Sequence, residues 1–307
     1  CIMKKRFILT LILSLAFAGL QTEPAQAGFV GSYKARISAN REIKNTQQEI
    51  KEVFVKQDKF TNAHDLDKLS DLYSESFVNN DGFDKKLYFK LIKDTWETYP
   101  EIQYDTLIRD IQIDGDYASV QTYETALAVT HEQSEKVDAY GELRSNANSI
   151  YYLKKSGKKW QIVSEQVLSE KSQLKYGDAR FIKMDLNAPR VINAGEEYSA
   201  ELSIDLADDE SGIASIDKQL VIHPLDKPEE AFRAIGADSE LERIFTANKK
   251  NINEYATASI GIAKSEPYDE NHSKVYMSGI AFLMSRVNVI PQNNFIKEED
   301  ENAQKTK

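Results

Sequence analysis

Cysteine is almost absent from this sequence. The chain of 307 residues has one, Cys1, and it precedes Met3. If Met3 is the initiator, Cys1 is lost, and the protein then has no disulfide, no thiol nucleophile and no cysteine-based metal site. The four histidines are scattered along the chain, so no metal site and no cofactor are expected. Without disulfides, hydrophobic cores must hold the fold together.

Positive charge is also scarce. The chain has 39 Lys and Arg against 49 Asp and Glu, which gives a net charge of −10 at pH 7. Nucleic acid and anionic membranes repel such a chain. The densest basic stretch, residues 154–159, surrounds Ser156-Gly157 and is expected to be an exposed hairpin tip. Nucleic acid is therefore excluded as a partner.

Sharp catalytic signatures are missing as well. The sequence has no GxGxxG, no phosphate-loop pattern, no HExxH and no GxSxG. The sequence has one long apolar run, from Phe7 to Leu20. This run is shorter than the roughly 20 residues that span a bilayer, so no membrane span is expected.

That single apolar run has the surroundings of a secretory signal peptide. Lys4, Lys5 and Arg6 precede it, and Ala25-Gln26-Ala27 follows it as a small-x-small cleavage site. We therefore predict a signal peptide over residues 1–27, cleaved after Ala27. The mature protein is expected in a bacterial periplasm or outside the cell.

The first part of the mature chain has a helical pattern. Apolar residues recur at helical spacing in residues 40–63, and a short helix is expected at 65–73. Asp84 can cap a third helix that reaches Tyr99, and Pro100 ends it.

After Pro100 the apolar period changes to two, as in β-strands. Short turns at Asp114-Gly115-Asp116 and at Ser156-Gly157 suit antiparallel hairpins. The pattern predicts an α+β arrangement in which the helices pack on one antiparallel sheet. Its strands are expected at residues 102–113, 117–131, 140–154 and 159–172.

Residues 40–176 resemble the nuclear transport factor 2-like (NTF2-like) superfamily, which includes ketosteroid isomerase and the SnoaL-like cyclases. The resemblance lies in Asp65–Tyr73, in Phe77–Gly82 and in the closing Gly157–Glu165. It implies a cone-shaped domain of three helices on a curved antiparallel sheet. It does not imply one activity, because the superfamily holds enzymes as well as binding and assembly domains.

The second part of the chain has strand patterns separated by Gly-containing and acidic turns, which favour a β-sandwich that is loosely immunoglobulin-like. Its strands are expected at 181–186, 198–206, 219–223, 255–263 and 275–290, whereas segments 229–235 and 240–248 could be helical. Residues 177–180 are expected to be a joint crossed by few contacts. The predicted domains are therefore 28–178 and 179–292, followed by a disordered charged tail, 293–307.

The resemblance also suggests site residues. Ketosteroid isomerase-like members carry a proton-abstracting carboxylate after the strand that follows the second helix, where Asn80 or Asp81 stands here. Asp81 precedes Gly82, so stabilisation of the turn is the competing interpretation. The tyrosine that stabilises the oxyanion in those enzymes is replaced by Gln57, a departure that argues against an isomerase. Gln57 lies on the apolar face of its helix, where it needs a partner or a wet cavity.

The remaining candidates for binding a ligand are aromatic or titratable. Tyr73, Trp96 and Tyr123 are either core aromatics or ligand contacts. Tyr123 and His131 share one parity of their strand and Glu124 has the other, so only one set can face a cavity between helices and sheet. The sequence leaves open which set that is.

The function expected from the sequence is that of an exported, non-catalytic binding protein. Its first domain would hold a small apolar or amphipathic molecule, or its surface would join an envelope complex. A second copy, bound through the sheet of the first domain, is another partner to consider. The alternatives are a small isomerase or dehydratase with Asp81 as base, and a purely structural adaptor.

Overall fold

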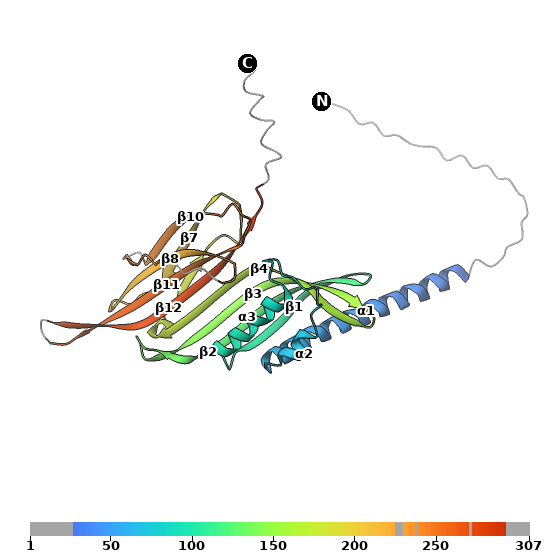
Figure 1. The fold of residues 1–307 in the computed structure, drawn as a ribbon, viewed down its shortest axis with the longest axis horizontal. Coiled ribbons are helices and arrows are strands. Elements are labelled where there is room, and N and C mark those ends of the chain that lie inside the picture. Colours follow the sequence, from blue (N-terminus) through green and yellow to red (C-terminus); the bar gives the residue numbers. More distant parts are fainter. Residues whose placement is uncertain (1–26, 225–229, 237–238, 270–271, 293–307) are drawn as a thin grey trace, which may run out of the picture. The chain divides into compact units, whose positions relative to one another are not determined.

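The computed structural model describes residues 27–224, 230–236, 239–269 and 272–292 (Figure 1). The apolar run and the charged tail lie outside the described residues, so the signal peptide and the disordered tail stay predictions. The described residues from Gln47 onward form one compact unit, and residues 27–46 belong to another. The longest helix, α1 (Ala27–Asn62), has residues in both.

The three predicted helices are confirmed as α1, α2 (Leu66–Ser70) and α3 (Lys85–Thr98). The backbone N–H of Leu87 donates to the Asp84 carboxylate at 2.8 Å, so Asp84 caps α3 as expected. The end of α1 is held against the sheet because the Asn62 amide donates to the Tyr104 carbonyl at 2.9 Å.

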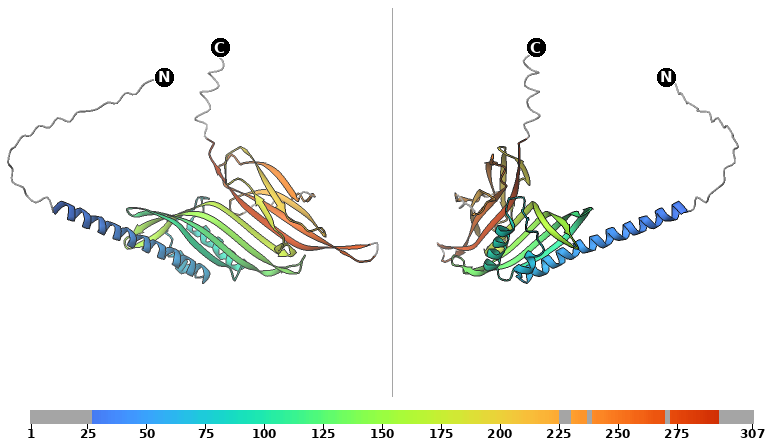
Figure 2. Two further views of the ribbon diagram at one scale, coloured as in Figure 1. Left: turned by 180° about the vertical axis from the view of Figure 1, so that it is seen from behind. Right: turned by 45° about the vertical axis from the view of Figure 1, so that its right-hand side comes forward.

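Four long strands follow the helices: β1 (Gln103–Asp114), β2 (Tyr117–Ser134), β3 (Ala139–Ser156) and β4 (Lys159–Gly177). Each pairs with the next in antiparallel register, which confirms the predicted meander and its two short turns. Helix α3 lies along one face of this sheet, as Figures 1 and 2 show, and buries Phe89 and Trp96. This part of the chain is α+β.

The second part of the chain contains strands and one short 3₁₀ turn, η1 (Asp178–Arg180), in its described residues. Residues 240–246 form strand β10, so the helical prediction for segment 240–248 is wrong. Strand β10 pairs along its length with β7 (Glu197–Ile204) and buries Phe245 there, and this tertiary pairing overrides local helix propensity. The strands are β5 (Met184–Asn187), β6 (Val191–Asn193), β7 (Glu197–Ile204), β8 (Glu210–Leu220), β9 (Arg233–Ala234), β10 (Glu240–Thr246), β11 (Glu254–Pro267) and β12 (Ser273–Ile290).

One sheet joins both parts of the chain. Its strand order is β1-β2-β3-β4-β12-β11-β8-β9, while β10, β7 and β5 form a second sheet. The link is the last third of β4, where Lys171–Gly177 pair with Gly279–Ser285 of β12. The expectation of few contacts across residues 177–180 is therefore wrong. The alternating pattern of β4 does not show that its last third pairs with β12 on the edge opposite β3.

Two separate hydrophobic clusters nevertheless fill the molecule. One lies between the helices and β1–β4, with Phe54, Phe77 and Tyr151 among its buried members. The other includes Leu202, Ile260 and Leu283, and it draws on strands of both sheets. The limits of the two predicted domains, and the immunoglobulin-like arrangement of the second, stay predictions. Among the described residues, no helix is both long and apolar enough to cross a membrane.

Candidate functional site

A small cavity lies between α1, α3 and the inner face of the sheet. Its volume is about 110 Å³, below the roughly 300–1,000 Å³ of pockets for drug-sized ligands. Its wall mixes apolar, aromatic and acidic side chains. The aliphatic residues are Leu69 and Ile92, the aromatic ones are Tyr73, Tyr88, Tyr104 and Tyr151, and the acidic ones are Asp58, Asp105 and Glu124.

Buried carboxyl and hydroxyl groups continue from this wall into the protein. We call Glu124, Glu165, Tyr73, Tyr88 and Tyr151 the Glu165 cluster. The Tyr151 hydroxyl lowers the pKa of both carboxyl groups, and the Tyr88 hydroxyl lowers that of Glu165. Tyr73 in turn packs beside Tyr88, with ring centroids 5.8 Å apart. The cluster thus connects the cavity-lining Glu124 to Glu165, which is 6% exposed.

Burial and mutual repulsion hold protons on these carboxyl groups. Burial, and then the charge of Glu124, raises the pKa of Glu165 to about 8 from an ordinary value of 4.5. Burial also raises the pKa of Glu124, although Thr122 donates to it at 2.6 Å. Glu165 is therefore mostly protonated at neutral pH, and the cluster can both donate and accept a proton.

Asp58 is a third carboxyl group whose pKa is changed by burial. It projects from α1 and accepts hydrogen bonds from the Thr106 backbone N–H at 3.2 Å and from the Thr106 hydroxyl at 2.6 Å. Burial nevertheless raises its pKa. A cation in the cavity would therefore favour ionisation of both Asp58 and Glu124.

Three of the residues named from the sequence line the cavity: Gln57, Tyr73 and Glu124. Gln57 is buried, and its Oε1 has no hydrogen-bond partner among the described residues. Tyr73 packs against Phe77 with ring centroids 5.1 Å apart. The open question of parity on β2 is answered by burial: Thr122 is buried on the side of Glu124, whereas His131 on the other parity is exposed.

The other three ligand candidates lie elsewhere. Trp96 is buried, and its ring stacks on His64 with centroids 4.5 Å apart. Tyr123 and His131 have the outward parity of β2, and Arg109 lies over the Tyr123 ring at 5.3 Å. None of the three is among the residues that line the cavity.

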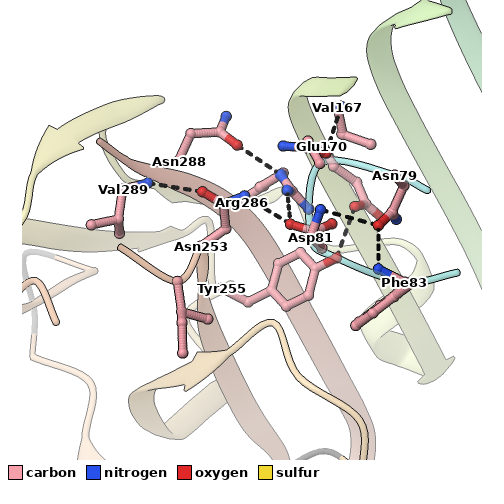
Figure 3. A network of polar contacts seen from close by, with 12 residues as sticks. Asn79, Asp81, Phe83, Val167, Glu170, Asn253, Tyr255, Arg286, Asn288 and Val289 are labelled. Atoms are coloured by element: carbon pink, nitrogen blue, oxygen red, sulfur yellow. Dashed lines mark hydrogen bonds and ion pairs between the residues drawn. The ribbon is translucent and has the colours of Figure 1, made fainter. Parts of the chain in front are cut away.

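Asp81 is also absent from the cavity wall, and it forms a buried ion pair instead (Figure 3). Its Oδ1 accepts from Arg286 at 2.5 Å and from the Asn253 amide at 2.7 Å. The Asp81 and Arg286 side chains are 4% and 1% exposed. The turn bonds expected of Asp81 are made by Asn79, whose Oδ1 accepts from the backbone N–H groups of Asp81 and Phe83.

More polar groups surround this ion pair, as Figure 3 shows. Arg286 donates through Nε to Asn288 at 3.0 Å, and the Tyr255 hydroxyl donates to Glu170 at 3.2 Å. Burial raises the pKa of Glu170, while the charge of Arg286 lowers it. We call Asp81, Arg286, Asn253, Asn288, Tyr255 and Glu170 the Arg286 network.

Sequence reasoning missed Glu165 because β4 contains a bulge. Ile162 pairs with Leu153 but Ser164 pairs with Tyr152, so Val163 has no partner in β3. Strict alternation from the buried Trp160 and Ile162 would turn Glu165 outward, whereas the bulge turns it inward. Arg286 was missed for a different reason, because its partner lies 205 residues away.

Neither a protein-family model nor a curated protein matches the chain. Similar solved structures include Bd1075 from Bdellovibrio bacteriovorus, 20% identical with a TM-score of 0.34, which matches over 41% of each chain. The present chain thus spans about two fifths of that protein.

Two smaller proteins are similar to about the same share of this chain. A LinA-type3 hexachlorocyclohexane dehydrochlorinase from Novosphingobium barchaimii is 8% identical with a TM-score of 0.35, over 42% of this chain and 88% of that one. A protein from Streptomyces avermitilis, described as a dehydratase of the NTF2-like family, is 12% identical with a TM-score of 0.33, over 40% of this chain and 96% of that one. Similarity at this level assigns no activity to this chain.

Proposed function

We propose that this protein is a non-catalytic binding protein whose cavity takes a small amphipathic molecule with a cationic end. The composition of the cavity wall carries the proposal. Carboxyl groups of Asp58, Asp105 and Glu124 attract a cation, while the rings of Tyr73 and Tyr104 offer it aromatic faces. The small volume limits the ligand to a short alkylammonium group or a molecule of similar size.

A test compares n-propylammonium with n-propanol, which has a similar shape and no charge. We expect the ammonium ion to raise the thermal midpoint in a concentration-dependent way, while the alcohol leaves it nearly unchanged. Because binding favours the ionised forms of Glu124 and Asp58, affinity should increase with pH until both groups are ionised. Glu124→Gln should abolish the response, and the exposed Glu101→Gln serves as the control. Equal responses to the two probes would refute the proposal.

Two coarser proposals accompany this function. The order of helix, short helix, helix and four antiparallel strands supports an NTF2-like cone for residues 40–176, with a β-sandwich after it.

The pattern of residues 3–27 supports export with cleavage after Ala27. Joining an envelope complex, or pairing with a second copy through the sheet, is a further role that the same fold could serve. The intact mass of exported protein tests the cleavage site, and a chain that keeps Phe7–Leu20 would refute it.

The second candidate function is acid–base catalysis, as in an isomerase or dehydratase. One observation favours it: the pKa of Glu165 is about 8, so this group and the nearby Glu124 can hold different protonation states at neutral pH. Glu124 would then be the base in place of Asp81, and Tyr88 and Tyr151 would connect it to the proton on Glu165. A structural adaptor with a filled first domain has less support, because the cavity is present.

A further inference from the structure

The loop at residues 79–83 lies against β4 at Glu165. The Asn80 backbone N–H donates to the Glu165 carbonyl at 2.9 Å, and the Val167 N–H donates to the Asn80 side chain at 3.3 Å. The loop therefore lies beside Glu165, along the edge of β4 that does not pair with β3.

The same loop leads directly into α3, which carries Tyr88. Asp84 follows the loop and caps the helix, and its carbonyl accepts from the Tyr88 N–H at 2.9 Å. Tyr88 thus lies in the first turn of α3. The loop therefore joins the strand that carries Glu165 to the helix that carries Tyr88.

Only one side of the loop is held by its own part of the chain. On that side Asn79 folds the loop by accepting from the N–H groups of Asp81 and Phe83 at 3.0 and 2.9 Å. On the other side Asp81 is held by Arg286 of β12 and by Asn253, which precedes β11. A buried arginine is costly unless it is paired, so this contact is made whenever the protein is folded.

We propose that Arg286 is a positioning residue for the cavity site: by holding Asp81, it keeps the 79–83 loop against β4 at Glu165, and with it the first turn of α3 that carries Tyr88. The second part of the chain is then needed to complete a site that lies wholly in the first. The role of Arg286 in placing the loop does not depend on the proposed function. Only its expected effect on ligand binding rests on that function.

The groups that face Glu165 identify what should change when the loop is released. They are Glu124 from β2, Tyr151 from β3, Tyr88 from α3, Tyr73 from the segment after α2, and Glu170 from β4 itself. Glu124, Tyr151 and Tyr73 would stay in place in a variant that alters Arg286. What the variant changes is the position of the loop and of Tyr88 beside Glu165, together with the charge next to Glu170.

The test is a double variant, Asp81→Asn with Arg286→Met, which removes both charges and leaves neither unpaired. The ionisation of Glu165 is followed by ¹³C NMR of its carboxyl group, assigned by comparison with Glu165→Gln. We expect the pKa of Glu165 to fall from about 8 toward its ordinary value of 4.5. Glu170→Gln, which removes the charge of Glu170 without touching Asp81, is the matched control and should lower that pKa by less than the double variant does.

A folded double variant that keeps the pKa of Glu165 at about 8 would overturn the proposal. If this variant does not fold, Asp81→Asn with Arg286→Gln keeps polar groups at both positions and decides the question by the same measurement. No ligand is used, so the result is independent of whether n-propylammonium binds. If it does bind, the double variant should also weaken its binding.

Discussion

Two buried acids in this protein are held in opposite ways. Asp81 has an arginine partner and is fully compensated, whereas Glu165 has hydroxyl partners and another carboxyl group beside it. The first arrangement stabilises an ionised group, and the second stabilises a protonated one. Substitution by the neutral amide should therefore have opposite effects at the two positions.

We expect Glu165→Gln to stabilise the protein at alkaline pH. The pKa of Glu165 rises from 4.5 to about 8 on folding, so between these values the folded state binds more protons than the unfolded state. Stability contributed by this group is complete below pH 4.5 and is lost as the pH rises through about 8. The variant should match the parent at pH 4 and exceed it by on the order of a few kcal/mol at pH 9. Thermal midpoints across this range measure the difference, with the exposed Glu101→Gln as control; a constant difference at all pH values would contradict the prediction.

For Asp81→Asn we expect a loss of stability of about 3–5 kcal/mol, because the substitution leaves the Arg286 charge buried and unpaired. If Asp81 only stabilised its turn, the substitution would be nearly neutral, since Asn makes the same turn bonds as Asp. Urea denaturation at pH 7 measures the change, and Asp114→Asn at an exposed position is the control. Adding Arg286→Met should recover part of the loss; a neutral single variant would show that the ion pair contributes nothing.

At the scale of elements, local pattern was sufficient in the first part of the chain. The helices and β1–β4 were predicted to within a few residues, apart from the start of α1 and the end of β4. Prediction failed at β10, whose strand form depends on pairing with β7, and at Glu165, whose orientation depends on a bulge. Gln57, Tyr73 and Glu124 could be named because each follows a regular period. Arg286 could not, because only the folded chain brings it to Asp81.

The junction between β4 and β12 depends on a glycine that has no room for a side chain. Gly177 has a φ of +59°, and a Cβ there would lie 2.3 Å from the carbonyl oxygen of Ser278. We expect Gly177→Ala to cost about 2–4 kcal/mol, from the left-handed backbone and the clash together. Gly157→Ala is the matched control, since Gly157 has a φ of +62° but open space around it. Chemical denaturation compares the two; equal losses would show that the junction tolerates a methyl group.

At the scale of the molecule, two hydrophobic clusters share one sheet and one buried ion pair. Residues 47–307 should therefore unfold together. Calorimetry is expected to show one transition whose van't Hoff and calorimetric enthalpies agree.

Limited proteolysis provides a second measurement at this scale. Cleavage at residues 177–180 should be slow, because η1 buries Ala179 and β4 pairs with β12 beside it. This replaces the expectation from sequence that a stable fragment of about residues 28–178 is released. Such a fragment, if it appeared early and unfolded cooperatively on its own, would show that the shared sheet adds little.

The bulge at Val163 has a counterpart five residues later. Asn148 pairs with Ser169 and Ser149 with Val167, so Leu168 is also unpaired. Each extra residue reverses the orientation of everything after it, and the two reversals cancel. Only residues 164–167 are out of phase with the rest of the strand. In relatives of this protein, the two extra residues should therefore be inherited or lost as a pair. Losing one alone would move every side chain at the β12-pairing end of β4 to the opposite face of the sheet.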